Sequence, residues 1–294
     1  MGEKISVLIL SSKKDSAGKN IKEAILDLSN WKEINVFNKN PVYKNPKLRD
    51  VYIITINDEA IKHENLDEEI EKKLNIKPKQ AIFISKHKSE SGKPTLTTHP
   101  IGNYGEAKFG GKTKTLTKAS PKFMTELLRI IKKNAELAKT YHQVCFEVTH
   151  HGPFLRIPTL FTEVGSTEEE WIKKTPAEVI AKSVLELLNK HHYEEDISKD
   201  IPVLIGIGGG HYAPRFTDIV LEKKVAFGHM IPTYQIKNGN INREIIKKTI
   251  EATPNITGVY LHKKSLKKSQ VTDYKKIFEE MNLPVVSSKE LTDL

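Results

Sequence analysis

Short apolar segments of strand length recur along the chain and alternate with segments of helical character. Residues 5–10, 51–56 and 81–85 are apolar runs, and the intervening segments 15–28 and 66–74 read as an amphipathic helix and a charged helix. A strand buried on both faces requires such a continuous apolar run. Strands that alternate with helices form parallel sheets through crossover connections. The chain therefore predicts an α/β fold, with a mixed, mostly parallel sheet flanked by helices.

The remainder of the chain continues this pattern. Ser120 followed by Pro121 predicts the start of a helix, because proline suits the first helical position. Capping-box sequences predict two further helix starts, at 166–169 and 175–178. Helices are also expected near 242–252 and 272–281, and strands at 144–149, 159–164, 201–207, 225–230 and 258–261.

One long region lacks any clean periodicity. Residues 86–119 carry several glycines, prolines and lysines between the predicted elements. Loops of this length in a compact domain are usually functional or mobile. No linker sequence is visible, so we expect one α/β domain over residues 1–294, with a glycine- and lysine-rich loop region at about 86–119.

The charge of the chain points to a polyanionic partner. Its formal net charge is +10, with 47 Lys and Arg residues, and nucleic acid is the commonest polyanion that such a protein attracts. General solubility of a lysine-rich protein explains the same charge. Cys145 is the single cysteine, which rules out an intrachain disulfide and a zinc finger. Without a signal peptide or a membrane-spanning segment in the sequence, we expect a cytoplasmic protein.

The apolar run 201–207 leads directly into three glycines, 208–210, followed by His211 and Arg215. Glycine backbone allows a ligand to approach closely, and ligands of open α/β sheets lie outside the carboxyl ends of the strands. A tight turn that needs glycine dihedrals explains the same residues equally well. The dinucleotide-binding fingerprint fails, because His211 stands where its third glycine is required.

Histidines and carboxylates gather where predicted strands end. Glu147, His150 and His151 stand just before the break formed by Gly152 and Pro153. His99, Glu163 and His211 occupy similar positions elsewhere in the chain. Such side chains can hold zinc without cysteine, or act as general base and acid; capping of strands or contact with RNA phosphates is the alternative. We expect the following histidines to be exposed to solvent instead: His63, His87, His142, His191, His192 and His262.

Lysines bracket the glycine pair 110–111 in the long loop region. Flexible lysines on a glycine-rich loop suit contact with a phosphate backbone without reading of bases. A charged run is also typical of a solvated face, and the lysines near residue 265 share that ambiguity. The loop lysines concerned are Lys108, Lys112, Lys114 and Lys118.

Four segments together resemble the signature blocks of the archaeal and plant type of D-aminoacyl-tRNA deacylase. They are 96–103 (LTTHPIGN), 147–153 (EVTHHGP), 161–166 (FTEVGS) and 206–217 (GIGGGHYAPRFT). The blocks follow the same order over nearly the whole chain. The resemblance implies hydrolysis of the ester that joins a D-amino acid to the 3′ end of tRNA, with zinc as cofactor. It also implies a fold similar to the phosphorylase/hydrolase-like α/β class that includes bacterial peptidyl-tRNA hydrolase.

Ester hydrolysis requires an activated water and donors for the oxyanion. We hypothesise that Glu147, His150 and His151 activate the water. Nearby metal ligands would be His99, Glu163 and His211. Amides of the glycine stretch would cradle the oxyanion or the terminal phosphate, and steric exclusion would reject L-aminoacyl esters. The expected tRNA contacts are Lys108, Lys112, Lys114, Lys118, Gly208, Gly209, Gly210 and Arg215.

Two other functions remain open from the sequence. A nucleoside phosphorylase-like enzyme would bind phosphate with the glycines 208–210 and Arg215, and its basic surface would be incidental. A non-catalytic tRNA-binding protein would use the histidines only for phosphate contact. Neither accounts for all four blocks at once. The partner expected from the deacylase hypothesis is the acceptor end of D-aminoacyl-tRNA, with no membrane and no protein partner, which is compatible with a monomer.

Overall fold

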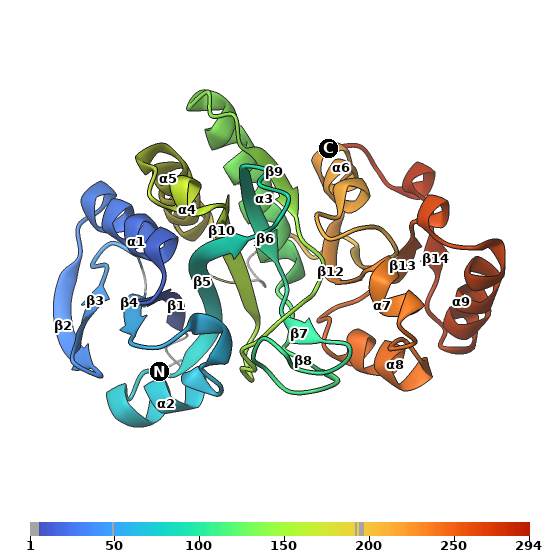
Figure 1. Ribbon diagram of the computed structural model, residues 1–294, viewed down its shortest axis with the longest axis horizontal. Helices are drawn as coiled ribbons and strands as arrows, with labels where there is room; N and C mark the ends of the chain where they lie inside the picture. Colours follow the sequence, from blue (N-terminus) through green and yellow to red (C-terminus); the bar gives the residue numbers. More distant parts are fainter. Residues whose placement is uncertain (1–5, 49, 192, 194–196) are drawn as a thin grey trace.

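The computed structural model describes residues 6–48, 50–191, 193 and 197–294. Ile5, which the sequence assigns to the first strand, and His192 lie outside these residues. The described strands form an eight-stranded sheet, a four-stranded sheet and a two-stranded pair. In Figure 1 the eight-stranded sheet occupies the left and centre of the molecule, and the four-stranded sheet lies to its right.

The eight-stranded sheet has the order β2-β3-β4-β1-β5-β10-β6-β9. Strands β4, β1, β5 and β10 run parallel to one another, and β6 pairs antiparallel with β10 and parallel with β9. The hairpin of β2 and β3 completes one edge. The strands are β1 (Ser6–Ser12), β2 (Lys32–Phe37), β3 (Asn40–Lys44), β4 (Val51–Ile56), β5 (Pro78–Lys88), β6 (Thr95–His99), β9 (Gln143–Phe146) and β10 (Thr159–Ser166).

The four-stranded sheet has the order β12-β11-β13-β14, and all its pairs are parallel. A short antiparallel pair, β7 with β8, lies between β6 and β9 in the chain order. The mixed, mostly parallel α/β architecture predicted from the sequence is therefore confirmed. The strands are β7 (Gly102–Asn103), β8 (Thr115–Leu116), β11 (Val203–Ile207), β12 (Ala226–Ile231), β13 (Gly258–Leu261) and β14 (Val285–Val286).

Helices cover both sheets, and the two sheets share one hydrophobic core. A single cluster of buried side chains joins Ile9 of β1, Phe123 of α3 and Phe227 of β12. No helix in the described ranges is long and apolar enough to cross a membrane. The helices are α1 (Ser16–Leu28), α2 (Leu66–Leu74), α3 (Pro121–Leu137), α4 (Glu168–Trp171), α5 (Lys174–Lys190), α6 (Pro214–Glu222), α7 (Thr233–Lys237), α8 (Arg243–Glu251) and α9 (Lys268–Glu280).

The expectation of a loop over the whole of residues 86–119 is wrong. Strand β5 extends into this region as far as Lys88, and β6 is an inner strand of the large sheet, between β10 and β9. All five residues of β6 are buried although its sequence, TLTTH, is mostly polar. A search for apolar periodicity cannot detect such a strand, because the threonines carry polar groups into the interior.

Two helix starts also differ from the prediction. Thr167 is the N-cap of α4 but its side chain makes no capping hydrogen bond, and α5 begins at Lys174, one residue before the predicted cap Thr175. The hairpin of β2 and β3 was not predicted. It carries an edge strand whose exposed face gives no clear signal of burial.

One half-buried cation joins α3 to the C-terminal part of the chain. Arg129 of α3 donates hydrogen bonds from Nε to the carbonyl oxygen of Val220 (2.9 Å) and from Nη2 to that of Lys223 (2.9 Å) and that of Val225 (3.3 Å). These three carbonyls lie at the end of α6 and in the turn before β12. Burial lowers the pKa of Arg129, and the carbonyl contacts compensate for lost hydration of its charge.

We predict that Arg129→Met lowers the free energy of unfolding by about 2–4 kcal/mol, because it leaves three carbonyl groups without a charged donor. Urea denaturation of the full chain measures the change. Lys132→Met is the matched control, because Lys132 is a cation of the same helix whose side chain is 45% exposed and pairs with Glu136. Equal stability of the two variants would contradict this account.

Candidate active site

Strand pairing brings three polar side chains to one face of the large sheet. Phe161 of β10 pairs with His99 of β6, and Gly165 of β10 pairs with His87 of β5. Residues 161, 163 and 165 of one strand share a face, so His87 and His99 stand on either side of Glu163. A Cβ at Gly165 would lie 3.0 Å from atoms of His87, so only glycine leaves room for this imidazole. Glu163 Oε2 lies 3.5 Å from His87 Nδ1 and 3.6 Å from His99 Nε2.

The segment that follows β9 joins both sheets and carries the next group of side chains. The amide of Glu147 donates to the carbonyl of Thr98 in β6 (3.1 Å). The next two amides donate to the carbonyls of His211, after β11, and of Met230 in β12, at 2.9 and 3.0 Å. The backbone therefore fixes Glu147 and His211 against each other before any side-chain contact is considered.

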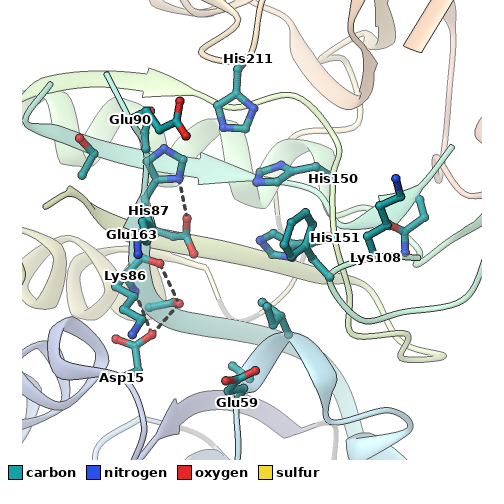
Figure 2. A pocket seen from close by; sticks show the side chains of 18 of the residues that line it. Asp15, Glu59, Lys86, His87, Glu90, Lys108, His150, His151, Glu163 and His211 are labelled. Carbon is teal, nitrogen blue, oxygen red and sulfur yellow. Dashed lines mark hydrogen bonds and ion pairs between the residues drawn. The ribbon is translucent and has the colours of Figure 1, made fainter. Parts of the chain in front are cut away.

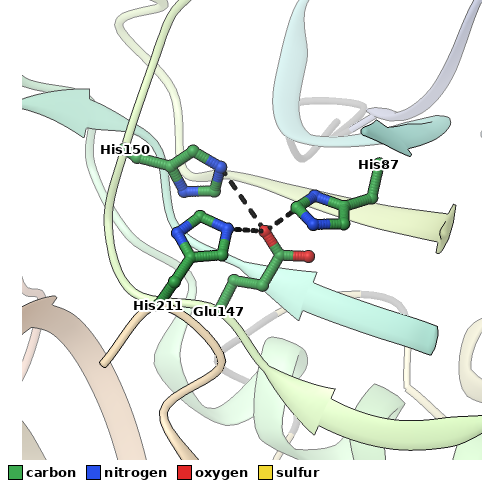
Figure 3. Close-up of side chains that lie close together, drawn as sticks. All are labelled: His87, Glu147, His150 and His211. Carbon is green, nitrogen blue, oxygen red and sulfur yellow. Dashed lines mark ion pairs between the residues drawn. The ribbon is translucent and has the colours of Figure 1, made fainter. Parts of the chain in front are cut away.

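Three imidazoles converge on one buried carboxylate oxygen. Glu147 Oε2 lies 3.0 Å from His211 Nε2, 3.1 Å from His87 Nδ1 and 3.4 Å from His150 Nε2 (Figure 3). The Glu147 side chain is completely buried, and neither of its oxygens has a hydrogen-bond partner in the described structure. A buried carboxylate without hydrogen bonds is costly, and the contacts with the three imidazoles offset part of that cost.

The ring orientation of His150 bears on what the cluster could hold. Its Nδ1 lies 2.8 Å from the carbonyl of Val148 and must donate to it, because a carbonyl only accepts. Burial, followed by the charges of His99 and His151, lowers the pKa of His150 well below its usual range. The neutral ring therefore presents an Nε2 lone pair toward the negative oxygen of Glu147. Two electron-rich atoms at this distance repel unless a cation lies between them.

A second group of side chains adjoins the first. His151 Nδ1 donates to the carbonyl of Gly152 (2.6 Å), which leaves its Nε2 free to accept, and burial with nearby His99 lowers the pKa of His151 to about 4. His99 Nδ1 lies 3.1 Å from the carbonyl of Pro100. Burial lowers the pKa of His99, but Glu163 outweighs this effect and the net shift is upward. The ring centroids of His99 and His151 lie 4.9 Å apart.

The carboxylates and the imidazoles shift each other's pKa values in opposite directions. Burial lowers the pKa of His87, but the hydrogen bonds and charges of Glu147 and Glu163 more than compensate and raise it to about 11. Burial raises the pKa of Glu163, yet His87 and His99 bring it down to about 2. Burial likewise raises the pKa of Glu147, yet His211 and His87 bring it well below its usual range. Both carboxylates therefore remain ionised at neutral pH, and a metal ion that bound His87 would displace the proton of that ring.

These side chains lie at the bottom of a large cleft of about 980 Å³. His87, His150, His151, His211 and Glu163 line it, and Figure 2 shows the three histidines 150, 151 and 211 grouped on one side, with His87 and Glu163 beside them. Glu147 and His99 are fully buried behind this lining. Aromatic side chains supply much of the remaining wall: Tyr104, Phe109, Trp171 and Tyr234.

All six residues predicted to act in catalysis or metal binding meet in this cluster: His99, Glu147, His150, His151, Glu163 and His211. The prediction that His87 is exposed is wrong, since only 5% of it is accessible. Strand β5 was expected to end at Ser85 and continues to Lys88, so His87 lies on the same sheet face as the cluster. His142 is also buried, where it contacts Glu170.

Two amides of the glycine stretch are not available to a ligand as predicted. The amide of Gly208 donates to the carbonyl of Ile231 (2.8 Å). The amide of Gly209 donates to Thr233 Oγ1 (2.9 Å) and Ser265 Oγ (2.8 Å). Because both amides already have partners, the prediction that they bind an oxyanion or a phosphate is wrong for these two residues, and for Gly210 it stays a prediction. The stretch instead positions His211, which follows it and lines the cleft.

Arg215 also has partners within the chain. Its Nε donates to the Tyr260 hydroxyl (3.1 Å) and its Nη2 donates to Ser288 Oγ (2.9 Å). Arg215 is not among the residues that line the cleft. Its guanidinium thus connects α6 to the C-terminal sheet, and the prediction of a tRNA contact here has no support in the geometry.

The predicted basic residues of the loop region divide between two hollows. Lys108 lines the cleft itself. Lys114 and Lys118 line a second, shallower hollow of about 490 Å³, together with Arg156 and Lys248. Lys112 lies between them in the chain, with its Nζ 4.1 Å from the centre of the Phe154 ring. Phe154 also lines the second hollow, and Gly102 of the cleft pairs with Leu116 of the hollow, so the two hollows adjoin.

Comparison with known proteins identifies the family. Residues 74–286 match the sequence model of the family described as D-aminoacyl-tRNA deacylase. The chain belongs to the D-aminoacyl-tRNA deacylase family. The matched span contains every histidine and carboxylate of the cluster.

Several relatives carry the same name. The D-aminoacyl-tRNA deacylase of Thermococcus onnurineus is 38% identical, over 95% of this chain and 98% of its own length. The enzyme of that name from Pyrococcus horikoshii is 44% identical, over 77% of this chain and 80% of its own length. A solved crystal structure of a conserved protein of unknown function is similar in fold, with a TM-score of 0.87, 30% identity and 98% coverage of both chains.

Proposed function

We propose that the cleft is the place where this chain hydrolyses the ester between a D-amino acid and the 3′ end of tRNA. Membership of the D-aminoacyl-tRNA deacylase family supports the reaction. The observation that supports the place is the convergence of His87, His150 and His211 on the buried Glu147 carboxylate at the bottom of a large cleft. Ester hydrolysis needs an activated water and a positive environment for the oxyanion.

We propose that His87, Glu147, His150 and His211 hold the zinc ion that the family resemblance implies. Their ligand atoms lie within 4.8 Å of one another, and the contacts to Glu147 measure 3.0, 3.1 and 3.4 Å. Ligand atoms that each lie 2.0–2.1 Å from one zinc ion are on the order of 3 Å apart, so one ion could contact this carboxylate oxygen and the three ring nitrogens. The lone pair of His150 that faces Glu147 is explained by such an ion.

The ring nitrogens that do not face Glu147 support the same assignment. His150 donates its other nitrogen to a backbone carbonyl, and His87 Nε2 lies 3.3 Å from the Tyr212 hydroxyl. Zinc ligands in proteins are usually oriented by such outer hydrogen bonds. Zinc bound here would supply a Lewis acid for the ester carbonyl and lower the pKa of a bound water.

Residues next to the proposed ligands would accept the proton of the attacking water and hold the ligands in place. His151 lines the cleft, its Nδ1 proton is held by the carbonyl of Gly152, and its Nε2 is therefore free to accept a proton from the attacking water. Glu163 would keep His87 and His99 in place through its contacts with both rings. This division changes the sequence hypothesis: Glu147 and His150 become ligands, His99 and Glu163 become positioning residues, and His87 joins the ligands.

The basic residues beside the cleft suit the acceptor arm of tRNA. Lys108 lines the cleft, and Lys114, Lys118 and Arg156 line the adjoining hollow. We propose that the ester enters the cleft while the phosphates of the acceptor arm lie along these cations. A tRNA substrate supports a cytoplasmic location for the protein.

The other two functions considered from the sequence are not favoured. A phosphorylase-like enzyme was expected to bind phosphate with the glycine stretch and Arg215, and the amides of Gly208 and Gly209 and the guanidinium of Arg215 are occupied by other groups of the chain. A non-catalytic tRNA-binding protein would leave the convergence of three imidazoles on a buried carboxylate unexplained.

Incubation with D- and L-tyrosyl-tRNA tests the proposed function. We expect rapid release of tyrosine from the D-ester alone, because steric exclusion in the cleft rejects the L-ester. Removal of the metal with a chelator should lower the rate by at least about 100-fold, and added zinc should restore it. Survival of both esters under all metal conditions would refute the proposal.

Substitution in the cluster sharpens this assay. His150→Ala should abolish stoichiometric zinc binding and deacylation together, whereas His151→Ala should lower the rate by on the order of 100-fold while zinc remains bound. His191→Ala is the control, because His191 lies at the C-terminal end of α5 and outside the cleft. Undiminished deacylation by His151→Ala would remove that residue from the mechanism.

Charge reversal tests the path of the tRNA. We expect Lys114→Glu and Lys118→Glu to raise the KM for D-tyrosyl-tRNA with little change in kcat, because the substituted residues contact phosphate and not the ester. The slope of log kcat/KM against log salt should become shallower by about one unit per lost contact. Lys182→Glu, an exposed lysine of α5, is the control. If neither Lys114→Glu nor Lys118→Glu changes the salt slope, the tRNA does not bind along this hollow.

A further inference from the structure

One aromatic side chain at the rim of the cleft has no role in the scheme above. Phe109 lines the cleft together with His150 and His151, yet its side chain is 66% exposed. A single exposed apolar side chain is ordinary on a protein surface. What distinguishes Phe109 is that its backbone is held rigidly, directly beside the histidine cluster.

The backbone of Phe109 is tied to the cluster by a short path. Its carbonyl accepts a hydrogen bond from the amide of Gly152 (3.1 Å), the residue that follows His151. Two residues further along, the amide of Gly111 donates to Glu64 Oε1 (2.7 Å). The position of Phe109 relative to the cluster is therefore set by hydrogen bonds on the backbone and not by burial of its ring.

Close packing fixes the loop further. Gly110 has a φ of +75°, and a Cβ at this position would lie 1.6 Å from the carbonyl oxygen of Ile61. Its own carbonyl accepts a hydrogen bond from Asn103 Nδ2 (2.8 Å). Only glycine fits here, so the residue after Phe109 holds the loop against the body of the protein while the phenyl ring faces the solvent.

A lysine accompanies this ring. Lys108 lines the same cleft, and its side chain is 74% exposed; its ion-pair partner is Glu106, at 3.8 Å, which is exposed as well. An exposed aromatic ring beside an exposed lysine is the combination that binds an unpaired nucleotide, because the base stacks on the ring and the phosphate contacts the cation.

We propose that Phe109 is the platform on which the 3′-terminal base of the tRNA stacks, with Lys108 at the adjoining phosphate. The inference rests on the proposed function. When the ester carbonyl lies at the cluster, the ribose and base of the terminal nucleotide extend from it toward the opening of the cleft, where the exposed ring of Phe109 lies. The ring of Phe109 could instead contact the side chain of the amino acid. That side chain carries no phosphate for Lys108 to contact, so the lysine favours a nucleotide at this position. Phe109 is thus a positioning residue that aligns the ester with the cluster.

The test compares Phe109→Ala and Phe109→Trp on two substrates. On D-tyrosyl-tRNA we expect Phe109→Ala to lower kcat/KM by on the order of 5- to 150-fold, mainly through KM, and Phe109→Trp to remain within about threefold of the unchanged protein. The second substrate is D-tyrosyl-tRNA whose 3′-terminal nucleotide lacks its base. With this second substrate, the unchanged protein should already have the lowered kcat/KM, and Phe109→Ala should lower kcat/KM by less than about a further twofold.

The outcomes separate the two proposals. Failure of the unchanged protein to hydrolyse D-tyrosyl-tRNA would contradict the proposed function. If that activity is present and Phe109→Ala keeps it within twofold, the stacking role is wrong and the function stands. A loss by Phe109→Ala that is equally large on the substrate without the base, or that disappears with D-alanyl-tRNA, would assign the ring to the amino acid and overturn the inference. Leu137→Ala, an exposed apolar residue at the end of α3, is the matched control.

Discussion

A completely buried carboxylate that faces imidazole nitrogens is the constraint on which the site depends. Glu147 is completely buried, and a lone pair of His150 faces its negative oxygen, which is an unfavourable contact. The protonated ring of His87 compensates part of the charge of Glu147. Backbone hydrogen bonds from the segment after β9 to both sheets fix these residues independently of their side chains. The proposed cation between His150 and Glu147 would make their contact favourable.

The site draws on both sheets, and neither could build it alone. The face of the large sheet supplies His87, His99 and Glu163, whose neighbouring positions follow from strand register. The turn after β11 in the smaller sheet supplies His211, and the segment after β9 adds the remaining side chains. The glycine stretch after β11 has a structural role, since its amides bind Ile231, Thr233 and Ser265 and thereby aim His211 into the cleft.

The sequence allowed the alternation of strands and helices and most of the cluster to be predicted, for a clear physical reason. Glu147, His150 and His151 directly follow a buried strand, and side chains at strand ends of α/β sheets meet at one place. His87 was not predicted, because its strand continues past the apolar run and this polar residue lies on the buried face. The polar strand β6 was not predicted for the same reason.

Partners that lie far apart in the sequence could not be predicted at all. The amide of Gly209 looked available because its acceptors, Thr233 and Ser265, come more than twenty residues later in the chain. The orientation of His150 depends likewise on a distant residue. Its ring donates to the carbonyl of Val148, and the amide of Val148 donates in turn to the carbonyl of His211. Residue types and spacing therefore located the cluster, whereas its division into ligands and proton carriers required the three-dimensional arrangement.

The central claim is that a cation lies between Glu147 and the imidazoles of His87, His150 and His211. A crystal of the full chain equilibrated with zinc, measured on both sides of the zinc absorption edge, tests it most directly. The account predicts an anomalous difference peak about 2.0–2.2 Å from Glu147 Oε2 and His150 Nε2. An empty map at this position, with His150 Nε2 protonated and hydrogen-bonded to Glu147, would contradict the account.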